Sequence, residues 1–377
     1  MNIIIGGDFA PTQSNMELFN NGDYNALLGE ELLSFWNTAD LRILNLETPI
    51  VDKKDPISKC GPNHIAPTST IKGIKALSPS LFTLANNHIL DQGIQGLKST
   101  EDILNKFEIP FVGVGENLED ASKPFIFHRD GLKIGIYTCT EHEFSIATES
   151  TPGANPFDPL ESLDHILALK AECNYVIVLY HGGKEYYRYP SPYLQRVCRK
   201  MAIKGADLVL CQHSHCIGCY EEYNGSTLVY GQGNFIFDGS NNEFEKTSLL
   251  VNVYIDDLMH VEYIPIMKSK EGIRIADKGV ADNILAEFHE RSNEILKSGF
   301  VKQSYHCFAC DNNLFYIRSF AGFGKWLSRI DRRLFMGLLS KQKYNKKKLL
   351  IIRNFIECES HRELILAGQP IDQYKEY

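Results

Sequence analysis

Six segments of this 377-residue chain end in polar side chains that can bind a metal ion. Each follows a short apolar run, and together they offer carboxylate, amide and imidazole groups. The segments read Gly6-Gly7-Asp8, Asn45-Leu46-Glu47, Asn86-Asn87-His88, Tyr180-His181-Gly182, His213-Ser214-His215 and Gly233-Asn234. Such a mixture of oxygen and nitrogen donors suits Zn, Mn or Fe better than Ca or Mg.

His213 and His215 form the strongest single element of this set. Alternate residues of a strand share a face, so both imidazoles can point into one site. The remaining side chains have plainer explanations when each is taken alone. Asp8, for example, can cap a helix, and a histidine that follows a strand is often structural. The ordered set therefore carries the metal-site hypothesis.

The apolar runs that precede these residues are typical of buried strands. They are rich in Ile, Val, Leu and Tyr, and their near-continuous apolar character favours strands covered on both faces. The predicted strands are residues 2–5, 41–46, 81–84, 133–138, 175–180, 208–210, 227–230 and 249–255. Segments 96–107 and 160–172 show helical spacing. We therefore expect an α/β sandwich whose strand carboxyl ends gather the polar segments in one crevice.

The motifs, in their order, resemble those of the capsule-synthesis CapA family, which belongs to the calcineurin-like metallophosphoesterase superfamily. The matching motifs are GD, NLETP, ANNHxxDxG, HxGxEY, GADLVxxxHxH and GNFxFD. The resemblance covers residues 1–255 and is specific only when the motifs are taken together. It implies a four-layer α/β/β/α sandwich of the metallophosphoesterase type with two divalent metal ions (Mn, Zn or Fe).

By motif position, the resemblance also implies roles for individual side chains. The implied metal ligands are Asp8, Glu47, Asn87, His181, His213 and His215, with Glu47 where the superfamily places its bridging carboxylate. His88 and Asp91 are the catalytic candidates: His88 as the imidazole beside the metals, and Asp91 as the carboxylate that orients it. A helix cap is an equally good explanation of Asp91. One departure is that Asp8-Phe9-Ala10 lacks the histidine of the superfamily's D-x-H motif, which predicts one site poorer in ligands.

Composition narrows the class of protein. A net charge of -8 argues against a nucleic-acid partner. The N-terminal apolar run stops at Gly6-Gly7-Asp8, unlike a signal peptide, and no apolar stretch approaches the roughly 20 residues of a membrane span. These features predict a cytoplasmic protein. Ten cysteines then indicate free thiols, although the pairs Cys216/Cys219 and Cys307/Cys310 could close a zinc site.

The composition shifts towards helix near the C-terminus. We expect a CapA-like metallophosphoesterase domain over residues 1–265 and a helical region over 280–377, with helices at 282–297, 320–339 and 348–359. Within 320–339 an apolar stripe lies beside arginines. That pattern is typical of a helix on an anionic membrane surface, or of a helix that packs on the rest of the protein and exposes its basic face.

Three functions compete at this point, and the oligomeric state stays open. The first is a phosphoesterase acting on a phosphorylated capsule or cell-envelope polysaccharide or on a sugar intermediate. The second is a metal-dependent amidase or peptidase on a γ-glutamyl polymer. The third is a non-catalytic, metal-stabilised component of a polysaccharide-synthesis assembly. The first is favoured, because two metals can activate water and clamp both oxygens of an in-line displacement.

Overall fold

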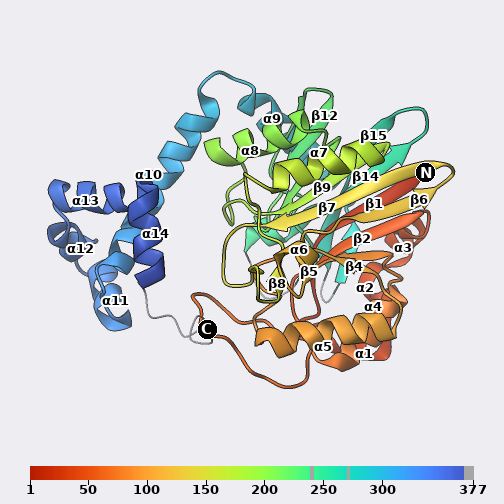
Figure 1. Cartoon of the computed structure of the whole chain (residues 1–377), viewed down its shortest axis with the longest axis horizontal. Coiled ribbons are helices and arrows are strands. Elements are labelled where there is room, and N and C mark those ends of the chain that lie inside the picture. The colour runs from red at the N-terminus through yellow and green to blue at the C-terminus, as the bar shows by residue number, and fades with distance from the viewer. Residues whose placement is uncertain (238–241, 270–271, 369–377) are drawn as a thin grey trace. The chain divides into compact units, whose positions relative to one another are not determined.

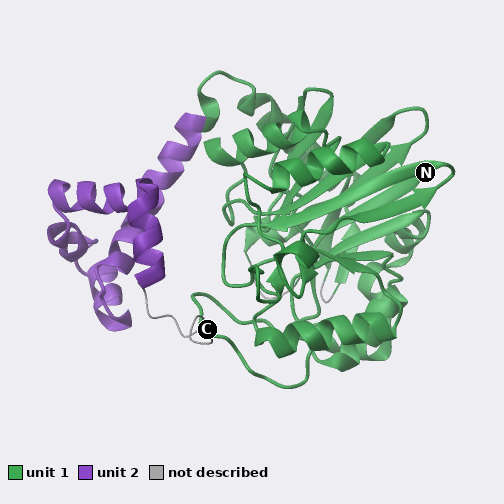
Figure 2. Cartoon of the chain, in the orientation of Figure 1, with its two compact units in different colours: residues 1–301 green, residues 302–377 purple. Residues whose placement is uncertain are grey.

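The computed structural model describes residues 1–237, 242–269 and 272–368. The chain divides into two compact units, Met1–Val301 and Lys302–Tyr377 (Figure 2). Unit 1 contains two large β-sheets with helices on either side (Figure 1). None of the helices in the described part of the chain combines the length and the apolar character that a membrane crossing requires.

The first sheet of unit 1 has eight strands among the described residues. Its order is β16-β15-β14-β1-β2-β3-β4, and β13 also pairs with β1. β1, β2, β3 and β4 run parallel, whereas β14, β15 and β16 continue the sheet in antiparallel fashion. The strands are β1 (Asn2–Ala10), β2 (Leu41–Leu46), β3 (Leu81–Thr83), β4 (Phe111–Val112), β13 (Asn234–Phe237), β14 (Thr247–Ile255), β15 (Met259–Ser269) and β16 (Gly272–Ile275).

The second sheet has six described strands in the order β11-β12-β10-β9-β7-β6. Its central strands β7, β9, β10 and β12 are parallel. The strands are β6 (Phe125–Arg129), β7 (Leu132–Thr140), β9 (Tyr175–His181), β10 (Leu208–Gln212), β11 (Tyr220–Tyr223) and β12 (Ser226–Tyr230), and a separate small ladder joins β5 (Val114–Gly115) to β8 (Gly153–Ala154).

The helices complete the element list. In unit 1 they are α1 (Met16–Asn21), α2 (Tyr24–Leu28), α3 (Glu30–Trp36), α4 (Ile71–Ala76), α5 (Gly93–Lys106), α6 (Leu118–Ala121), α7 (Ser162–Glu172), α8 (Pro192–Ile203) and α9 (Lys278–Ile295), with short 3-10 turns η1 (Thr68–Thr70) and η2 (Glu243–Glu245). The helices that follow are α10 (Phe300–Phe320), α11 (Lys325–Arg333), α12 (Leu338–Lys343), α13 (Lys346–Glu357) and α14 (Glu359–Gly368).

Successive side chains of each buried strand point to opposite faces of its sheet, and each face packs in a separate core. Ile3 and Ile5 of β1 enter an apolar core shared with Ile177 and Leu179 of β9, so this core lies between the two sheets. Ile4 points the other way, into a core completed by α1 to α5. On the outer side of the second sheet, β9 packs against α7 and α8 in the same manner. The predicted four-layer α/β/β/α sandwich is confirmed, as is the helical C-terminal region.

Helix α9 lies in unit 1, beyond residue 265, where the sequence suggested the first domain to end. Its Phe288 is buried and packs on Tyr220 of β11 and Tyr263 of β15, one strand from each sheet. The ring centroids are 5.2 and 4.8 Å apart, respectively. Because α9 covers both sheets at one edge, the compact unit extends to Val301.

Candidate metal centre

Both sheets bring predicted ligands to the same end of the sandwich. From the first sheet, Asp8 lies in β1 and Glu47 directly follows β2. From the second, His181 is the last residue of β9, and His213 directly follows β10. The carboxyl ends of parallel strands are where α/β folds place their ligands. The structure therefore brings side chains up to 205 positions apart into one buried cluster.

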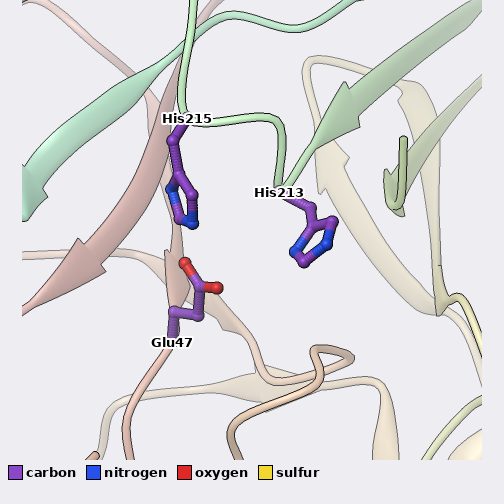
Figure 3. A group of neighbouring side chains, drawn as sticks. All are labelled: Glu47, His213 and His215. Atoms are coloured by element: carbon purple, nitrogen blue, oxygen red, sulfur yellow. The ribbon is translucent and has the colours of Figure 1, made fainter. Parts of the chain in front are cut away.

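Glu47 belongs to two candidate metal-binding groups in the described residues. One consists of Asp8, Glu47 and His181, and the other of Glu47, His213 and His215. Within each group the potential ligand atoms all lie within 4.8 Å of one another. Figure 3 shows the Glu47 carboxylate pointing towards the rings of His213 and His215. A carboxylate common to both groups is the arrangement that a bridging ligand requires.

The surroundings of Glu47 fit a cation. Both carboxylate oxygens are buried, and neither has a hydrogen-bond partner. Burial, together with the neighbouring Asp8 carboxylate, raises the pKa of Glu47 to about 8. An unpaired buried carboxylate is strongly unfavourable without a positive partner. The neighbouring imidazoles are donors that Zn, Mn and Fe accept, so the residues present fit a divalent metal site.

The pKa values of His181, His213 and His215 shift in different directions. Burial lowers the pKa of His181, and burial together with His181 lowers the pKa of His213 well below its usual value. Burial also disfavours the charged form of His215, but the Glu47 and Asp8 carboxylates outweigh it and raise the pKa of His215. His181 Nε2 lies 3.1 Å from His213 Nδ1 and 3.4 Å from Glu47 Oε1. A lowered pKa favours the neutral imidazole of His181 and His213, which is the form that binds a metal ion.

Unusual backbone geometry holds the last two histidines. His213 has φ 77° and His215 has φ 52°, in the left-handed region that non-glycine residues seldom adopt. Two hydrogen bonds hold this turn: His213 N–H donates to Asp8 Oδ2 at 3.0 Å, and His215 Nδ1 lies 2.8 Å from Asn234 Oδ1. The two rings share the site because of this strained turn, whereas the sequence predicted alternation along a strand. Strain of this kind often marks functional sites.

Amides orient the carboxylate and imidazole groups. The Asn87 amide oxygen lies 3.0 Å from His181 Nε2, while its Nδ2 donates to Glu143 Oε2 at 3.0 Å. Asn45 Nδ2 donates to Asp8 Oδ1 at 2.8 Å. Asn87 therefore lies in the cluster, beside His181. Asn45 was named only as part of a motif and Glu143 was missed, because no local pattern marks either as a neighbour of the site.

His88 and Asp91 form a hydrogen-bonded pair beside Glu47. His88 Nδ1 lies 2.6 Å from Asp91 Oδ2, and its Nε2 lies 4.0 Å from Glu47 Oε1. Asp91 also accepts a hydrogen bond from the His64 backbone N–H at 2.5 Å. Because Asp91 accepts the Nδ1 proton, Nε2 is the ring atom that faces the carboxylate cluster.

Lys59 completes this pair and was missed in the sequence. Its ammonium group forms an ion pair with Asp91 Oδ1 and lies 3.2 Å from His88 Nδ1. The His64 ring packs against His88, with ring centroids 4.1 Å apart. Burial is the larger cause, and the neighbouring His88 the second, of a pKa of His64 lowered to about 4. Lys59 and His64 lie in the long irregular segment between β2 and η1. Such a loop inside a compact domain was the available signal, since long loops often carry function.

The cysteine pairs contribute no ligands to these groups. Cys216 and Cys219 are buried in unit 1, and Cys307 and Cys310 are exposed on α10. Neither candidate metal-binding group in residues 1–237, 242–269 and 272–368 includes a cysteine. Cys219 packs in the apolar core on the outer side of the second sheet, as a small apolar residue does.

The layers and the carboxylate–histidine cluster define an α/β/β/α protein with a candidate metal centre at its strand ends. The chain belongs to the bacterial capsule synthesis protein family PGA_cap, whose model matches residues 2–239. The resemblance carried by the motifs is thereby confirmed.

Two Bacillus proteins named CapA are similar to part of the chain. The chain is 31% identical to the PGA biosynthesis protein CapA of Bacillus subtilis over 198 residues, 52% of either chain. It is 30% identical to the capsule biosynthesis protein CapA of Bacillus anthracis over 223 residues, covering 56% of this chain and 54% of the relative. The chain therefore spans about half the length of these two relatives.

Solved structures give a weaker similarity. A putative 5'-nucleotidase from Staphylococcus aureus shares 14% identity with a TM-score of 0.42, covering 77% of this chain and 58% of that one. The NAD nucleotidase of Haemophilus influenzae shares 14% identity with a TM-score of 0.44. The match covers 77% of this chain and 56% of the nucleotidase. Similarity at this level assigns no activity to the chain.

Proposed function

We propose that this chain is a metal-dependent hydrolase that cleaves a phosphoester bond. The observation that carries the proposal is Glu47, a buried carboxylate without a hydrogen-bond partner that belongs to both candidate metal-binding groups. Asp8, Glu47, Asn87 and His181 would hold one ion, and Glu47, His213 and His215 the other. When bound, two divalent metals supply Lewis-acid chemistry and lower the pKa of a coordinated water molecule.

The chain's own residues supply proton transfer. His88 Nε2 faces the cluster and is the group that would give a proton to the leaving oxygen. Asp91 fixes the ring through Nδ1, and Lys59 neutralises the Asp91 carboxylate. Asp91 and Lys59 are therefore positioning residues in this proposal, and His88 is its catalytic residue.

Family membership supports a substrate in capsule or envelope synthesis. The names of the two Bacillus relatives refer to capsule and PGA biosynthesis. We propose a phosphorylated sugar or polysaccharide intermediate as the substrate class, since a two-metal site of oxygen and nitrogen donors is suited to phosphoester displacement.

A substrate panel tests the proposal. Metal-free protein, prepared with a chelator, would be given Mn, Zn, Fe or Mg and assayed on p-nitrophenyl phosphate, bis-p-nitrophenyl phosphate and γ-glutamyl-p-nitroanilide. We expect metal-dependent release of p-nitrophenol from a phosphate ester, and its loss in Glu47→Gln. Turnover of the anilide alone, or no metal-dependent turnover of any substrate, would overturn the phosphoesterase proposal.

A further inference from the structure

The helical C-terminal unit exposes its large apolar side chains. Of the 27 large apolar residues that are exposed among the described residues, 18 lie between residues 302 and 368. Over the same described segment, only Ile317 and Ala321 are buried apolar residues. Soluble surfaces seldom leave contiguous apolar area of this kind uncovered. Unit 2, purple in Figure 2, therefore has a surface suited to an apolar partner.

Around the turn between α11 and α12, two polar side chains are buried whereas large apolar side chains are exposed. Asp331 and Ser340 are fully buried, and Asp331 accepts hydrogen bonds from Ser340 Oγ at 2.5 Å and from Leu339 N–H at 3.0 Å. Trp326, Leu334 and Met336 are exposed by 77, 73 and 80%. Because these hydrogen bonds hold the turn between the two helices, the outward direction of the apolar side chains is built into the unit.

The part of the chain that carries this apolar surface is rich in basic residues. Residues 318–353 contain eleven Lys and Arg but a single acidic residue, Asp331, which is buried and paired with Arg318 at 3.3 Å. Residues 302–377 carry 14 basic and 7 acidic residues, a net charge of +7, in a chain of net charge -8. Residues 318–353 thus carry a large excess of basic groups, of which Arg318 pairs with Asp331 and Arg353 with Glu357.

We propose that unit 2 is a peripheral module that binds an anionic lipid bilayer through its α11–α12 surface, the exposed residues Trp326, Leu327, Ile330, Leu334, Phe335 and Met336. The apolar side chains enter the bilayer interface, and Arg329, Arg332 and Arg333 contact the headgroups. This inference does not depend on the proposed hydrolase activity, and its test measures binding alone.

An anionic bilayer matches both properties of the surface. A second copy of the chain would cover the apolar residues but would bring another set of eleven basic residues towards the first. A nucleic acid would satisfy the charge and leave Leu334 and Met336 in water. An acidic lipid surface offers an apolar interior and negative headgroups together.

Co-sedimentation of the full chain with vesicles tests the proposal. We expect binding to vesicles of phosphatidylcholine with 30% phosphatidylglycerol, weak binding to pure phosphatidylcholine, and release as salt rises and screens the charges. Arg332→Gln/Arg333→Gln should lower the partition coefficient roughly tenfold or more, since each basic residue near the surface adds to the affinity. The matched control Arg196→Gln/Lys200→Gln, on exposed residues of α8, should bind like the wild type.

The apolar contribution has its own variants. Leu334→Asn/Met336→Asn should weaken binding about tenfold or more, because the loss of buried apolar area weakens insertion. Leu160→Asn, at a residue of unit 1 as exposed as Trp326, should not. Urea unfolding of each variant checks that the fold is retained, which we expect because every substituted residue is exposed.

Tryptophan fluorescence reports the insertion directly. The chain has two tryptophans: Trp36 is buried in the core between the first sheet and α1 to α5, and Trp326 is exposed on α11. A blue shift of the emission on addition of anionic vesicles, absent in Trp326→Phe, is the expected result. Equal recovery in the supernatant with both vesicle types at low salt, or wild-type binding by Leu334→Asn/Met336→Asn, would overturn the proposal. Vesicle-free dimerisation abolished by the latter variant would overturn it in favour of a second copy.

Discussion

Lys59 and Asp91 form an ion pair that is almost wholly removed from solvent, with side-chain exposures of 2 and 0%. Removal of one member of such a pair leaves an uncompensated buried charge. We therefore expect Lys59→Met to lower the free energy of unfolding of the metal-free protein by about 3–5 kcal/mol. Asp91→Asn should also destabilise, and the double variant should cost less than the sum of the two. Urea unfolding of all three variants measures this coupling.

A matched control for that experiment lies in the same loop. Lys53 is 4.0 Å from Asp55, and both side chains are exposed. Lys53→Met should therefore change the free energy of unfolding by no more than about 0.5 kcal/mol. Additive losses from Lys59→Met and Asp91→Asn would contradict the pairing.

If Lys59 also positions His88, then Lys59→Met should lower kcat about 10- to 100-fold at unchanged KM, with partial rescue by Lys59→Arg.

The shared position of Glu47 predicts an unequal effect on metal content. Glu47→Gln should remove both ions, because this carboxylate belongs to both candidate groups. His213→Ala should lower the content to about one ion per chain, since His213 belongs to one group only. Elemental analysis by mass spectrometry after dialysis against a defined metal buffer gives the number per chain. Full metal content in Glu47→Gln would show that the carboxylate does not bridge two ions.

Apolar patterning predicted the strands, because β1, β2, β9, β10 and β14 are buried on both faces and read as continuous apolar runs. The four-layer order came from the family resemblance. The end of β1 was less predictable. The strand was expected to stop at Ile5, but it continues through Gly6 and Gly7 to Ala10 because this part pairs with β13 as well as with β2. A Cβ on Gly7 would collide with the Gly233 carbonyl oxygen, which explains a glycine there. Such a requirement arises only from a partner more than 200 positions away.

Helical spacing did not reveal where the C-terminal helices break. Segment 320–339 was predicted as one helix, but α11 and α12 occupy only parts of it. Gly322 and Gly337, with φ 67° and 83°, interrupt the helix at either side of α11. The apolar stripe was visible in the sequence. Its exposure was not, since it depends on the burial of Asp331 and Ser340.

The residues of the candidate site also divide into those that the sequence could predict and those that it could not. Residues at strand ends were predictable, because apolar runs mark the strands and the sheet brings their ends together. Lys59 and Glu143 lie in irregular segments, where no periodicity indicates which way a side chain points. Their contacts with Asp91 and Asn87 depend on how those segments fold back over the sheets.

His88 should be needed for turnover and dispensable for metal binding. Its Nε2 is 4.0 Å from Glu47 Oε1, and its Nδ1 is engaged by Asp91. We expect His88→Ala to keep the wild-type metal content while turnover of the best aryl phosphate falls roughly 10²- to 10⁴-fold. The control His128→Ala, at an exposed position of β6, should leave both quantities unchanged. Loss of metal from His88→Ala would instead make this imidazole a ligand.

Glu143 should tune metal affinity although it is itself exposed. Its Oε2 accepts the Asn87 Nδ2 hydrogen bond, which turns the Asn87 amide oxygen towards His181. Without this acceptor the amide is free to rotate and present its NH₂ group, which binds no cation. Partners of this kind contribute 10- to 100-fold in affinity, and solvent exposure places Glu143 near the lower limit. We therefore expect Glu143→Ala to weaken metal binding about tenfold in a competition titration against a fluorescent chelator. Glu143→Gln retains an acceptor and should lose less metal affinity. The control Glu149→Ala, on the neighbouring exposed loop, should lose none. Equal metal affinity in all three variants would show that Asn87 needs no external partner.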